Sequence, residues 1–129
     1  MALSPAARSK GLRLEVFDRL GSTNDEAGER ARTGDPGGLW IMAREQGAGR
    51  GRHGRVWQSP PGNLYASLLL VDPCAPAIAP QIGFVAGVAV HDAVVRLGGF
   101  AAGRLMLKWP NDLLLDGAKL TGILVEGSV

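Results

Sequence analysis

Residues 39–71 read LWIMAREQGAGRGRHGRVWQSPPGNLYASLLLV, two apolar segments separated by a basic, glycine-rich loop. Leu39–Glu45 has the length and composition of a short buried strand. Leu64–Val71 is a near-continuous apolar run, which predicts a strand buried on both faces. Between them, residues 46–57 hold four glycines, three arginines and one histidine. The sequence therefore predicts a flexible cationic loop between two strands of a sheet.

The segments on either side of these strands predict alternating strands and helices. Leu12–Leu20 alternates apolar and polar residues, as a strand does. Ser22-Thr23-Asn24, followed by two acidic residues, predicts the start of a helix at about 24–33. Ala77–Leu97 has helical spacing and predicts a long, well-buried helix that ends at Gly98-Gly99.

The C-terminal third predicts further β-structure. Leu105–Trp109 is typical of a strand stopped by Pro110. Leu113–Leu115 and Lys119–Glu126 flank Asp116-Gly117, which is a strong signal for a hairpin turn. The order of elements predicts a mixed β-sheet flanked by helices, in the α+β (α/β) class.

Length and composition indicate one globular domain. The chain has 129 residues, of which 46% are hydrophobic and 20% charged, and we expect a domain over residues 12–129 after a disordered lead at residues 1–11. The net charge of +2 argues against a protein that coats nucleic acid. Cys74 is the only cysteine, which excludes an internal disulfide and fits a reducing compartment.

The sequence predicts a soluble, cytoplasmic protein with no membrane partner. The N-terminus lacks the apolar core of a signal peptide. The longest apolar run, around Ile82–Val95, is interrupted by glycines, His91 and Asp92. We expect this run to be too short and too polar to span a membrane.

The glycine-rich loop favours an anionic ligand. Glycines let backbone N–H groups point into a concavity, and arginines add forked donors that match phosphate or carboxylate. No Gly-Lys-Ser/Thr follows, so the loop is not a Walker loop. The GxGxxG pattern at Gly49, Gly51 and Gly54 opens no helix, unlike a dinucleotide fingerprint. A solvated basic loop or an Arg-Gly nucleic-acid-binding segment stays open at this point.

Two further stretches are candidates for chemistry. In Lys108-Trp-Pro-Asn-Asp112 a carboxylate follows a strand, and beside an anion-binding loop it could hold Mg²⁺ between phosphates. A plain turn capped by Asp112 is the alternative. In Lys119–Glu126 a lysine opens an apolar strand that contains Gly122, and a strand glycine often marks the close approach of a ligand. A hairpin strand with a solvated Lys119 is the alternative. No transition-metal site is expected, because these residues have no partners at metal-ligand spacing: His53, His91 and Cys74.

Taken together, these stretches resemble the biotin protein ligases. The order of the motifs matches that family: Ser22-Thr23-Asn24, GRGRHGRVW at 49–57, Asn63-Leu64-Tyr65, KWPND at 108–112 and KLTGILVE at 119–126. The resemblance covers about residues 12–127. It implies the catalytic-domain fold that biotin ligases share with class II aminoacyl-tRNA synthetases and lipoate ligases. It also implies a two-step reaction: biotin and Mg-ATP give biotinyl-5′-adenylate and pyrophosphate, and biotin then passes to a lysine of the carrier domain of a biotin-dependent carboxylase.

The resemblance implies roles for residues at matching positions. Arg50 and Arg52 would stabilise charge at the α-phosphate and hold the adenylate, and Lys119 would bind the biotin carboxylate and then the phosphoryl link. Trp57 would cover the adenine. The expected biotin contacts are Ser22, Thr23, Asn24, Gln46, Gly49, Arg50, Gly51, Arg52, Lys119 and Gly122. The expected nucleotide contacts are Arg52, Arg55, Trp57, Asn111 and Asp112, and Asp112 is also the expected Mg²⁺ ligand.

The resemblance also sets limits and leaves alternatives. Family members continue beyond GILVE with a further strand and helices, so we expect a catalytic domain truncated at the C-terminus. Whether this chain is active or an inactive fragment stays open, as does a homodimer. The helix-turn-helix of repressor-type members is missing, so no operator binding is expected. A lipoate-type ligase is one alternative, against which the arginine-rich loop argues. An Arg-Gly nucleic-acid-binding module is the other, and it would leave KWPND and GILVE unexplained.

Overall fold

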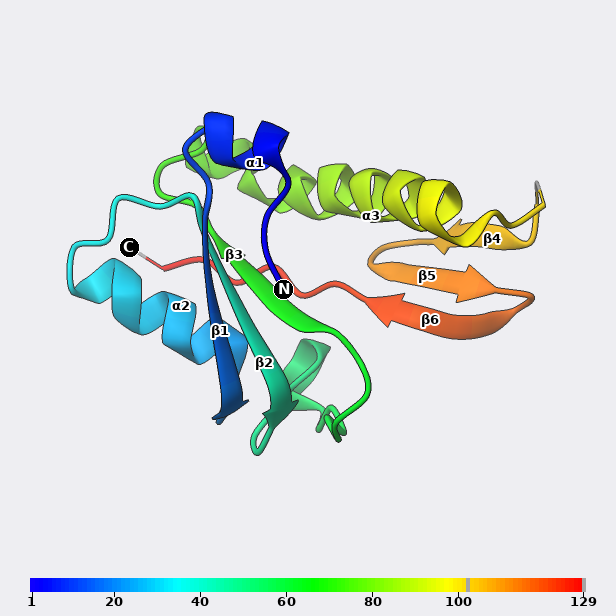
Figure 1. The fold of residues 1–129 in the computed structure, drawn as a ribbon, viewed down its shortest axis with the longest axis horizontal. Helices are drawn as coiled ribbons and strands as arrows, with labels where there is room; N and C mark the ends of the chain where they lie inside the picture. Colours follow the sequence, from blue (N-terminus) through cyan, green and yellow to red (C-terminus); the bar gives the residue numbers. More distant parts are fainter. Residues whose placement is uncertain (102, 129) are drawn as a thin grey trace. The chain divides into compact units, whose positions relative to one another are not determined.

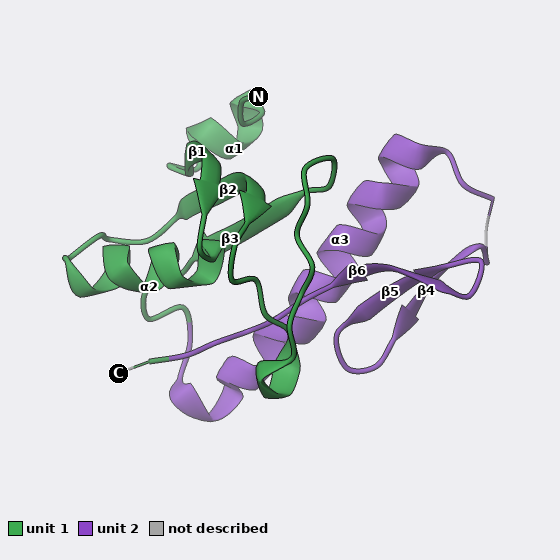
Figure 2. Ribbon diagram, turned by 90° about the horizontal axis from the view of Figure 1, so that it is seen from below, with its two compact units in different colours: residues 1–73, 128–129 green, residues 74–127 purple. Residues whose placement is uncertain are grey.

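The computed structural model describes residues 1–101 and 103–128, and the chain divides into two compact units (Figure 2). Unit 1 is built on Met1–Pro73 and unit 2 on Cys74–Gly127. Unit 1 contains a sheet of order β1-β2-β3, and unit 2 contains a sheet of order β4-β5-β6.

Unit 1 is a mixed sheet with a helix on one face (Figure 1). Its elements are α1 (Pro5–Ser9), β1 (Arg13–Leu20), α2 (Thr23–Arg32), β2 (Leu39–Gln46), the 3-10 turn η1 (Arg52–Gly54) and β3 (Tyr65–Leu69). β1 runs parallel to β2, and β3 runs antiparallel to it. Because parallel neighbours need a crossover, α2 connects β1 to β2 and packs against β2 and β3. The predicted mixed sheet flanked by helices is confirmed.

The core of unit 1 lies between α2 and β2. Leu39 and Ile41 are fully buried, and Ala27 of α2 and Leu69 of β3 pack with them. Residues of β2 alternate between buried and partly exposed along most of the strand, so one face of β2 carries the core. This packing fixes both the start of α2 and the end of β2, which are the two elements that build the candidate site.

β3 is less buried than the sequence predicts. Tyr65, Ser67 and Leu69 are buried, whereas Ala66 and Leu68 are only half-buried. The prediction of a strand buried on both faces is wrong, because buried residues alternate along β3 and only one of its faces joins the core.

Residues 1–11 contain a short helix where the sequence suggests a disordered lead. The helix α1 begins after Ser4, whose Oγ accepts a hydrogen bond from the N–H of Ala7 at 3.2 Å. Pro5 occupies the first helical position, where its missing N–H costs nothing. A cap and a proline in the right order are therefore sufficient to start this single turn.

Unit 2 is a helix on an antiparallel sheet. Its elements are η2 (Pro76–Gln81), α3 (Ile82–Gly98), β4 (Leu105–Lys108), β5 (Asp112–Leu115) and β6 (Ala118–Gly122). The predicted turn at Asp116-Gly117 is confirmed, since both residues adopt the left-handed backbone that a two-residue hairpin turn requires (φ 51° and 84°). The predicted end of the long helix is also confirmed, with Gly99 at φ 60°.

The second hairpin strand is shorter than predicted. β6 ends at Gly122, which pairs with Asp112 at the first position of β5. Residues 123–127 have no regular structure, because β5 offers no partner beyond Asp112. The prediction of a strand up to Glu126 is therefore wrong.

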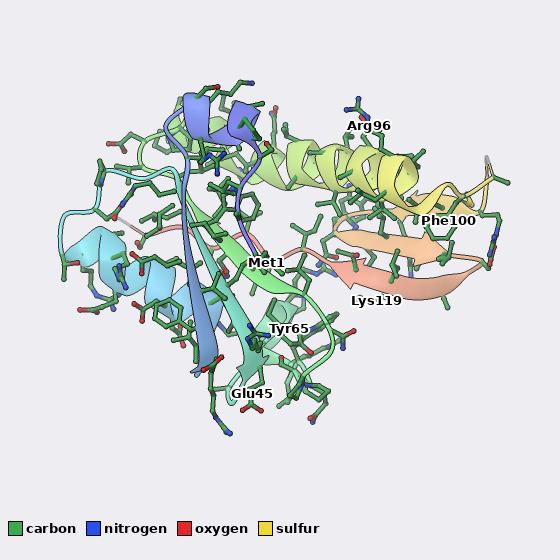
Figure 3. The ribbon with its side chains drawn as sticks, in the orientation of Figure 1. Met1, Glu45, Tyr65, Arg96, Phe100 and Lys119 are labelled. Carbon is green, nitrogen blue, oxygen red and sulfur yellow. The ribbon has the colours of Figure 1, made fainter. Side chains whose placement is uncertain are left out.

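α3 is not the well-buried helix that its apolar spacing predicts. Gly87 is its only buried residue, whereas Phe84, Val85 and Val88 are exposed. β4 and β5 contact one face of the helix, and Arg96 projects on the side away from the strands (Figure 3). The apolar spacing correctly predicted the helix but not its exposure.

The segment Pro76–Gly98 is longer and more apolar than the sequence analysis allows. It has 23 residues and contains an 18-residue window with a mean hydropathy of 1.5, so by length and composition it could cross a membrane. The run around Ile82–Val95 was predicted to be too short and too polar to span a membrane, and the longer helical segment that contains this run overturns that prediction. A single helix of this kind is by itself weak evidence for a membrane protein.

A two-pronged ion pair fastens the start of β1 to the loop that precedes β2. Both guanidinium nitrogens Nη1 and Nη2 of Arg13 donate to the Asp35 carboxylate, at 3.0 and 2.5 Å. The N–H of Gly37 donates to the same carboxylate at 2.9 Å. The hydrogen bonds from Arg13, and then the one from Gly37, lower the pKa of Asp35 from its ordinary value of 3.8.

We predict that Asp35→Asn lowers the free energy of unfolding at neutral pH and flattens its dependence on acid. The carboxyl pKa is lower in the folded chain, so its stabilising contribution is full above the unfolded pKa of about 4 and is lost as pH falls through the folded value. Urea unfolding at a series of pH values measures this. Asp18→Asn is the control, because that side chain is 96% exposed. Equal acid dependence in wild type and Asp35→Asn would contradict the prediction.

Candidate functional site

The expected biotin contacts of unit 1 meet where α2 begins and β2 ends. Ser22 caps α2, and its Oγ accepts a hydrogen bond from the N–H of Asp25 at 3.3 Å. Thr23 is the first helical residue, so its N–H has no carbonyl partner within the helix. That N–H donates to Oε1 of Gln46 at 2.8 Å, and the Thr23 hydroxyl donates to the same oxygen at 3.1 Å. The structure thus brings Ser22, Thr23 and Gln46 together.

A buried hydroxyl of β3 extends this network to Asn24. The Oγ of Ser67 lies 2.7 Å from Oγ1 of Thr23 and donates a hydrogen bond to Oδ1 of Asn24. Ser67 and Thr23 are both buried. The sequence analysis missed Ser67, although a serine at an inward-facing position of an apolar strand is a usable signal.

A second serine joins Gln46 to the loop. The Nε2 of Gln46 donates to Oγ of Ser59 at 3.1 Å, and Ser59 in turn donates to the carbonyl oxygen of Trp57 at 2.9 Å. Ser59 is buried. It was also missed, because Ser59-Pro60-Pro61 has the composition of an ordinary turn.

The glycine-rich loop folds back on itself as a narrow hairpin. The N–H of Trp57 donates to the carbonyl oxygen of Gly49 at 2.9 Å, and the N–H of Gly51 donates to that of Arg55 at 2.7 Å. The 3-10 turn η1 forms the tip, where His53 adopts a left-handed backbone with φ 58°. Arg50 and Arg52 are thus held at the end of a hairpin that begins at the Gln46 network.

The three arginines of the loop have different surroundings. Nη1 of Arg50 lies 2.8 Å from Oδ1 of Asp25, in the first turn of α2. Arg52 and Arg55 are exposed, and neither forms an ion pair within residues 1–101 and 103–128. Their guanidinium groups can therefore meet an anionic ligand without first giving up a carboxylate.

Gly49 is required by close packing. A Cβ at this position would lie 2.5 Å from Oγ of Ser59, 2.8 Å from the carbonyl oxygen of Trp57 and 2.9 Å from Nε2 of Gln46. The absence of a side chain at Gly49 therefore allows Ser59 to reach both of its partners.

The expected site residues of unit 2 gather on β5 and β6. Nζ of Lys119, labelled in Figure 3, lies 3.0 Å from Oδ1 of Asp112. That oxygen is buried and accepts no hydrogen bond from the described residues, so the contact is an ion pair without hydrogen-bond geometry. Lys119 is thus ion-paired rather than simply solvated.

Asn111 has a structural partner. Its Nδ2 donates to the carbonyl oxygen of Ile123 at 2.8 Å, and the N–H of Ile123 donates to the Asn111 carbonyl oxygen at 2.9 Å. These bonds hold the turn before β5 against the chain that leaves β6 at Gly122. Asn111 therefore positions its neighbour Asp112 whatever else it contacts.

Asp112 is compatible with Mg²⁺ bound largely by a substrate. No cluster of three or more His, Cys, Asp or Glu residues occurs in the part of the chain that the structure describes. Mg²⁺ often binds through one or two carboxylates together with nucleotide phosphates. Asp112 supplies a carboxylate of the right chemistry for that mode, and its buried Oδ1 lies 3.0 Å from Nζ of Lys119.

Comparison with known proteins identifies the family of these motifs. The family model described as Biotin/lipoate A/B protein ligase family matches residues 16–128. The biotin–acetyl-CoA-carboxylase ligase of Paracoccus denitrificans is 49% identical over 88% of this chain and 46% of its own. The bifunctional ligase/repressor BirA of Escherichia coli is 41% identical over 88% of this chain and 34% of its own.

Solved structures show the same likeness. The biotin protein ligase of Aquifex aeolicus, in complex with biotin and ATP, has a TM-score of 0.76 and 31% identity, over 90% of this chain and 47% of that one. The biotin protein ligase of Leishmania major, in complex with biotinyl-5-AMP, has a TM-score of 0.74 and 28% identity, over 90% and 52%. The chain spans about half the length of these relatives or less.

We predict that Gly49→Ala destabilises the chain by about 1–3 kcal/mol, the usual cost of overpacking. The added methyl group must displace Ser59 or the backbone at Trp57. Gly51→Ala is the matched control, because its Cβ would meet nothing closer than 3.9 Å. Thermal unfolding of the two variants beside wild type measures the difference, and equal melting temperatures for both would contradict the prediction.

Proposed function

The chain belongs to the Biotin/lipoate A/B protein ligase family, and from this premise we propose that it takes part in ATP-dependent biotinylation of a carboxylase carrier domain. The observation that carries the proposal is the network of Thr23, Gln46 and Ser59 at the base of the arginine loop. It sets uncharged donors and acceptors beside exposed guanidinium groups, which suits a ligand with a polar ring and an anionic end.

The proposed reaction has two steps. In the first, a carboxylate oxygen of biotin attacks the α-phosphorus of ATP, and the bond to pyrophosphate breaks. In the second, the neutral amine of a carrier lysine attacks the acyl carbon, AMP leaves with the bonding electrons, and the amine loses a proton to solvent. Neither step needs a nucleophile from this chain.

In unit 1 the proposed roles follow the geometry. Ser22, Thr23 and Gln46 would bind the polar ring of biotin. Asn24, whose Oδ1 accepts a hydrogen bond from Ser67, would line the same site. Arg50 and Arg52 would lie against the α-phosphate, where negative charge increases during attack. Gly51 would let the backbone approach the ligand, and Arg55 and Trp57 would contact the nucleotide.

In unit 2 the proposed roles belong to Lys119 and Asp112. Lys119 would bind the biotin carboxylate and then the phosphoryl link of the adenylate, and Gly122 would leave space beside it. Asp112 would hold Mg²⁺, which neutralises phosphate charge when it is bound. The ion pair between Lys119 and Asp112 orients the ammonium group before substrate arrives.

The names of the relatives favour biotin over lipoate, since the Paracoccus denitrificans, Aquifex aeolicus and Leishmania major proteins are named biotin ligases. An Arg-Gly loop that binds nucleic acid is less well supported, because Arg50 is paired with Asp25 of the same unit. A filter-retention assay with labelled oligonucleotides at low salt distinguishes this alternative.

We also propose the cytoplasm, where ATP is available, as the compartment of the reaction.

The direct test of the proposal is biotin-dependent exchange of labelled pyrophosphate into ATP. The assay uses the 129-residue chain alone and the chain supplied with the part of the Paracoccus denitrificans ligase that the match leaves uncovered. We expect exchange that requires biotin. Its absence in both reactions would contradict the proposal.

We predict that Arg52→Gly weakens retention of the adenylate by about 10- to 100-fold, because a hydrogen bond to a charged group contributes about 1.5–3 kcal/mol. Release of labelled adenylate during gel filtration measures this. Arg8→Gly is the control, because Arg8 lies in α1, away from the loop in sequence and within an exposed turn. Unchanged retention would show that the loop does not hold the adenylate.

We predict that Lys119→Ala weakens biotin binding and slows adenylation together. The variant loses the cation that the carboxylate would contact and leaves Asp112 as an uncompensated charge. Isothermal titration with biotin and the exchange assay measure the two effects, with Lys10→Ala as the control. Unchanged biotin affinity would reduce Lys119 to a structural partner of Asp112.

A further inference from the structure

Gln46 is the residue on which the unit 1 network converges, and its amide group has two ends with opposite hydrogen-bonding character. The oxygen Oε1 only accepts, and the nitrogen Nε2 only donates. Which end faces a ligand decides whether the ligand must offer a donor or an acceptor. The orientation of this amide therefore sets the specificity of the site.

One end of the amide is fixed by the backbone of α2. The N–H of Thr23 can only donate, and it lies 2.8 Å from the Gln46 side chain. Its partner must therefore be the amide oxygen. The Thr23 hydroxyl donates to the same oxygen at 3.1 Å, so two hydrogen bonds hold this end of the amide.

The other end is fixed by Ser59, whose hydroxyl has a single proton. The carbonyl oxygen of Trp57 can only accept, so the Ser59 proton is used in that bond, at 2.9 Å. Toward Gln46, at 3.1 Å, Ser59 can then only accept. The partner of Ser59 must therefore be the amide nitrogen.

We infer that Ser59 is a positioning residue, which locks the Gln46 amide so that one N–H of Nε2 bonds Ser59 and the second N–H stays available to a ligand. The ligand group that Gln46 takes is then a hydrogen-bond acceptor, such as a carbonyl oxygen. Identification of the ligand as biotin rests on the proposed function, whereas the orientation of the amide does not.

The orientation is tested first without any ligand. Side-chain amide spectra of ¹⁵N-labelled chain, with the Gln46 signal assigned by its loss in Gln46→Glu, give the exchange rates of the two Nε2 protons. We expect one proton protected from exchange in wild type and about tenfold less protected in Ser59→Ala, as loss of one hydrogen bond implies. Ser67→Ala is the matched control, since it removes a buried hydroxyl of the same network that does not touch Gln46.

Two results would overturn the inference. The first is a wild-type Gln46 amide that exchanges as fast as an exposed side chain, which decides the matter even when Ser59→Ala does not fold. The second is equal protection in wild type and Ser59→Ala.

Biotin affinities of wild type, Ser59→Ala, Gln46→Ala and the double variant then test the positioning role. We expect Ser59→Ala to weaken binding by about two- to tenfold, the effect of one hydrogen bond, and to add nothing once Gln46 is absent. Ser59→Thr, which keeps the hydroxyl, should restore affinity. Additive effects of the two substitutions would assign Ser59 a separate structural role. Lack of biotin binding by wild type would count against the proposed function, while the amide spectra still decide the orientation.

Discussion

The contact between Thr23 and Gln46 joins the first turn of α2 to the last residue of β2. It exists because a helix must leave its first N–H groups without internal partners, and here a side chain at a strand end supplies the missing acceptor. The parallel pairing of β1 with β2 brings these two points to the same edge of the sheet. Gln46 in turn donates to Ser59, and Ser59 donates to the carbonyl oxygen of Trp57. These bonds tie the two ends of the arginine loop to each other and to the sheet.

The glycine-rich loop combines a rigid base with an exposed tip. At the base, atoms of Ser59, Trp57 and Gln46 fill the space beside Gly49, so a larger residue does not fit there without movement of its neighbours. At the tip, Arg52 and Arg55 are exposed. This division suits a segment that must keep its register on the sheet while its cations adjust to a ligand. In unit 2, Lys119 forms an ion pair with Asp112. The hydrogen bond from Asn111 to Ile123 fixes the turn that carries this carboxylate.

Local patterns predicted most of the elements but not their surroundings. Caps, periodicity and turn chemistry placed α2, β1, β2 and the Asp116-Gly117 turn, because these signals act over a few residues. Burial of β3 and α3 was overestimated, since burial depends on which neighbours cover a face, and the sequence of one segment does not contain that information. Among the candidate residues, the motifs found Thr23 and Gln46 but missed the two serines. Each serine acts through tertiary contacts with residues distant in sequence.

We infer that the network at the start of α2 and the arginine loop form one ligand site. The most direct measurement is backbone hydrogen exchange of the 129-residue chain, with and without biotin and Mg-ATP. The account predicts slower exchange at Thr23 and Asn24 and across residues 46–57, with little change in α1. Unchanged exchange in both segments at saturating ligand would contradict it.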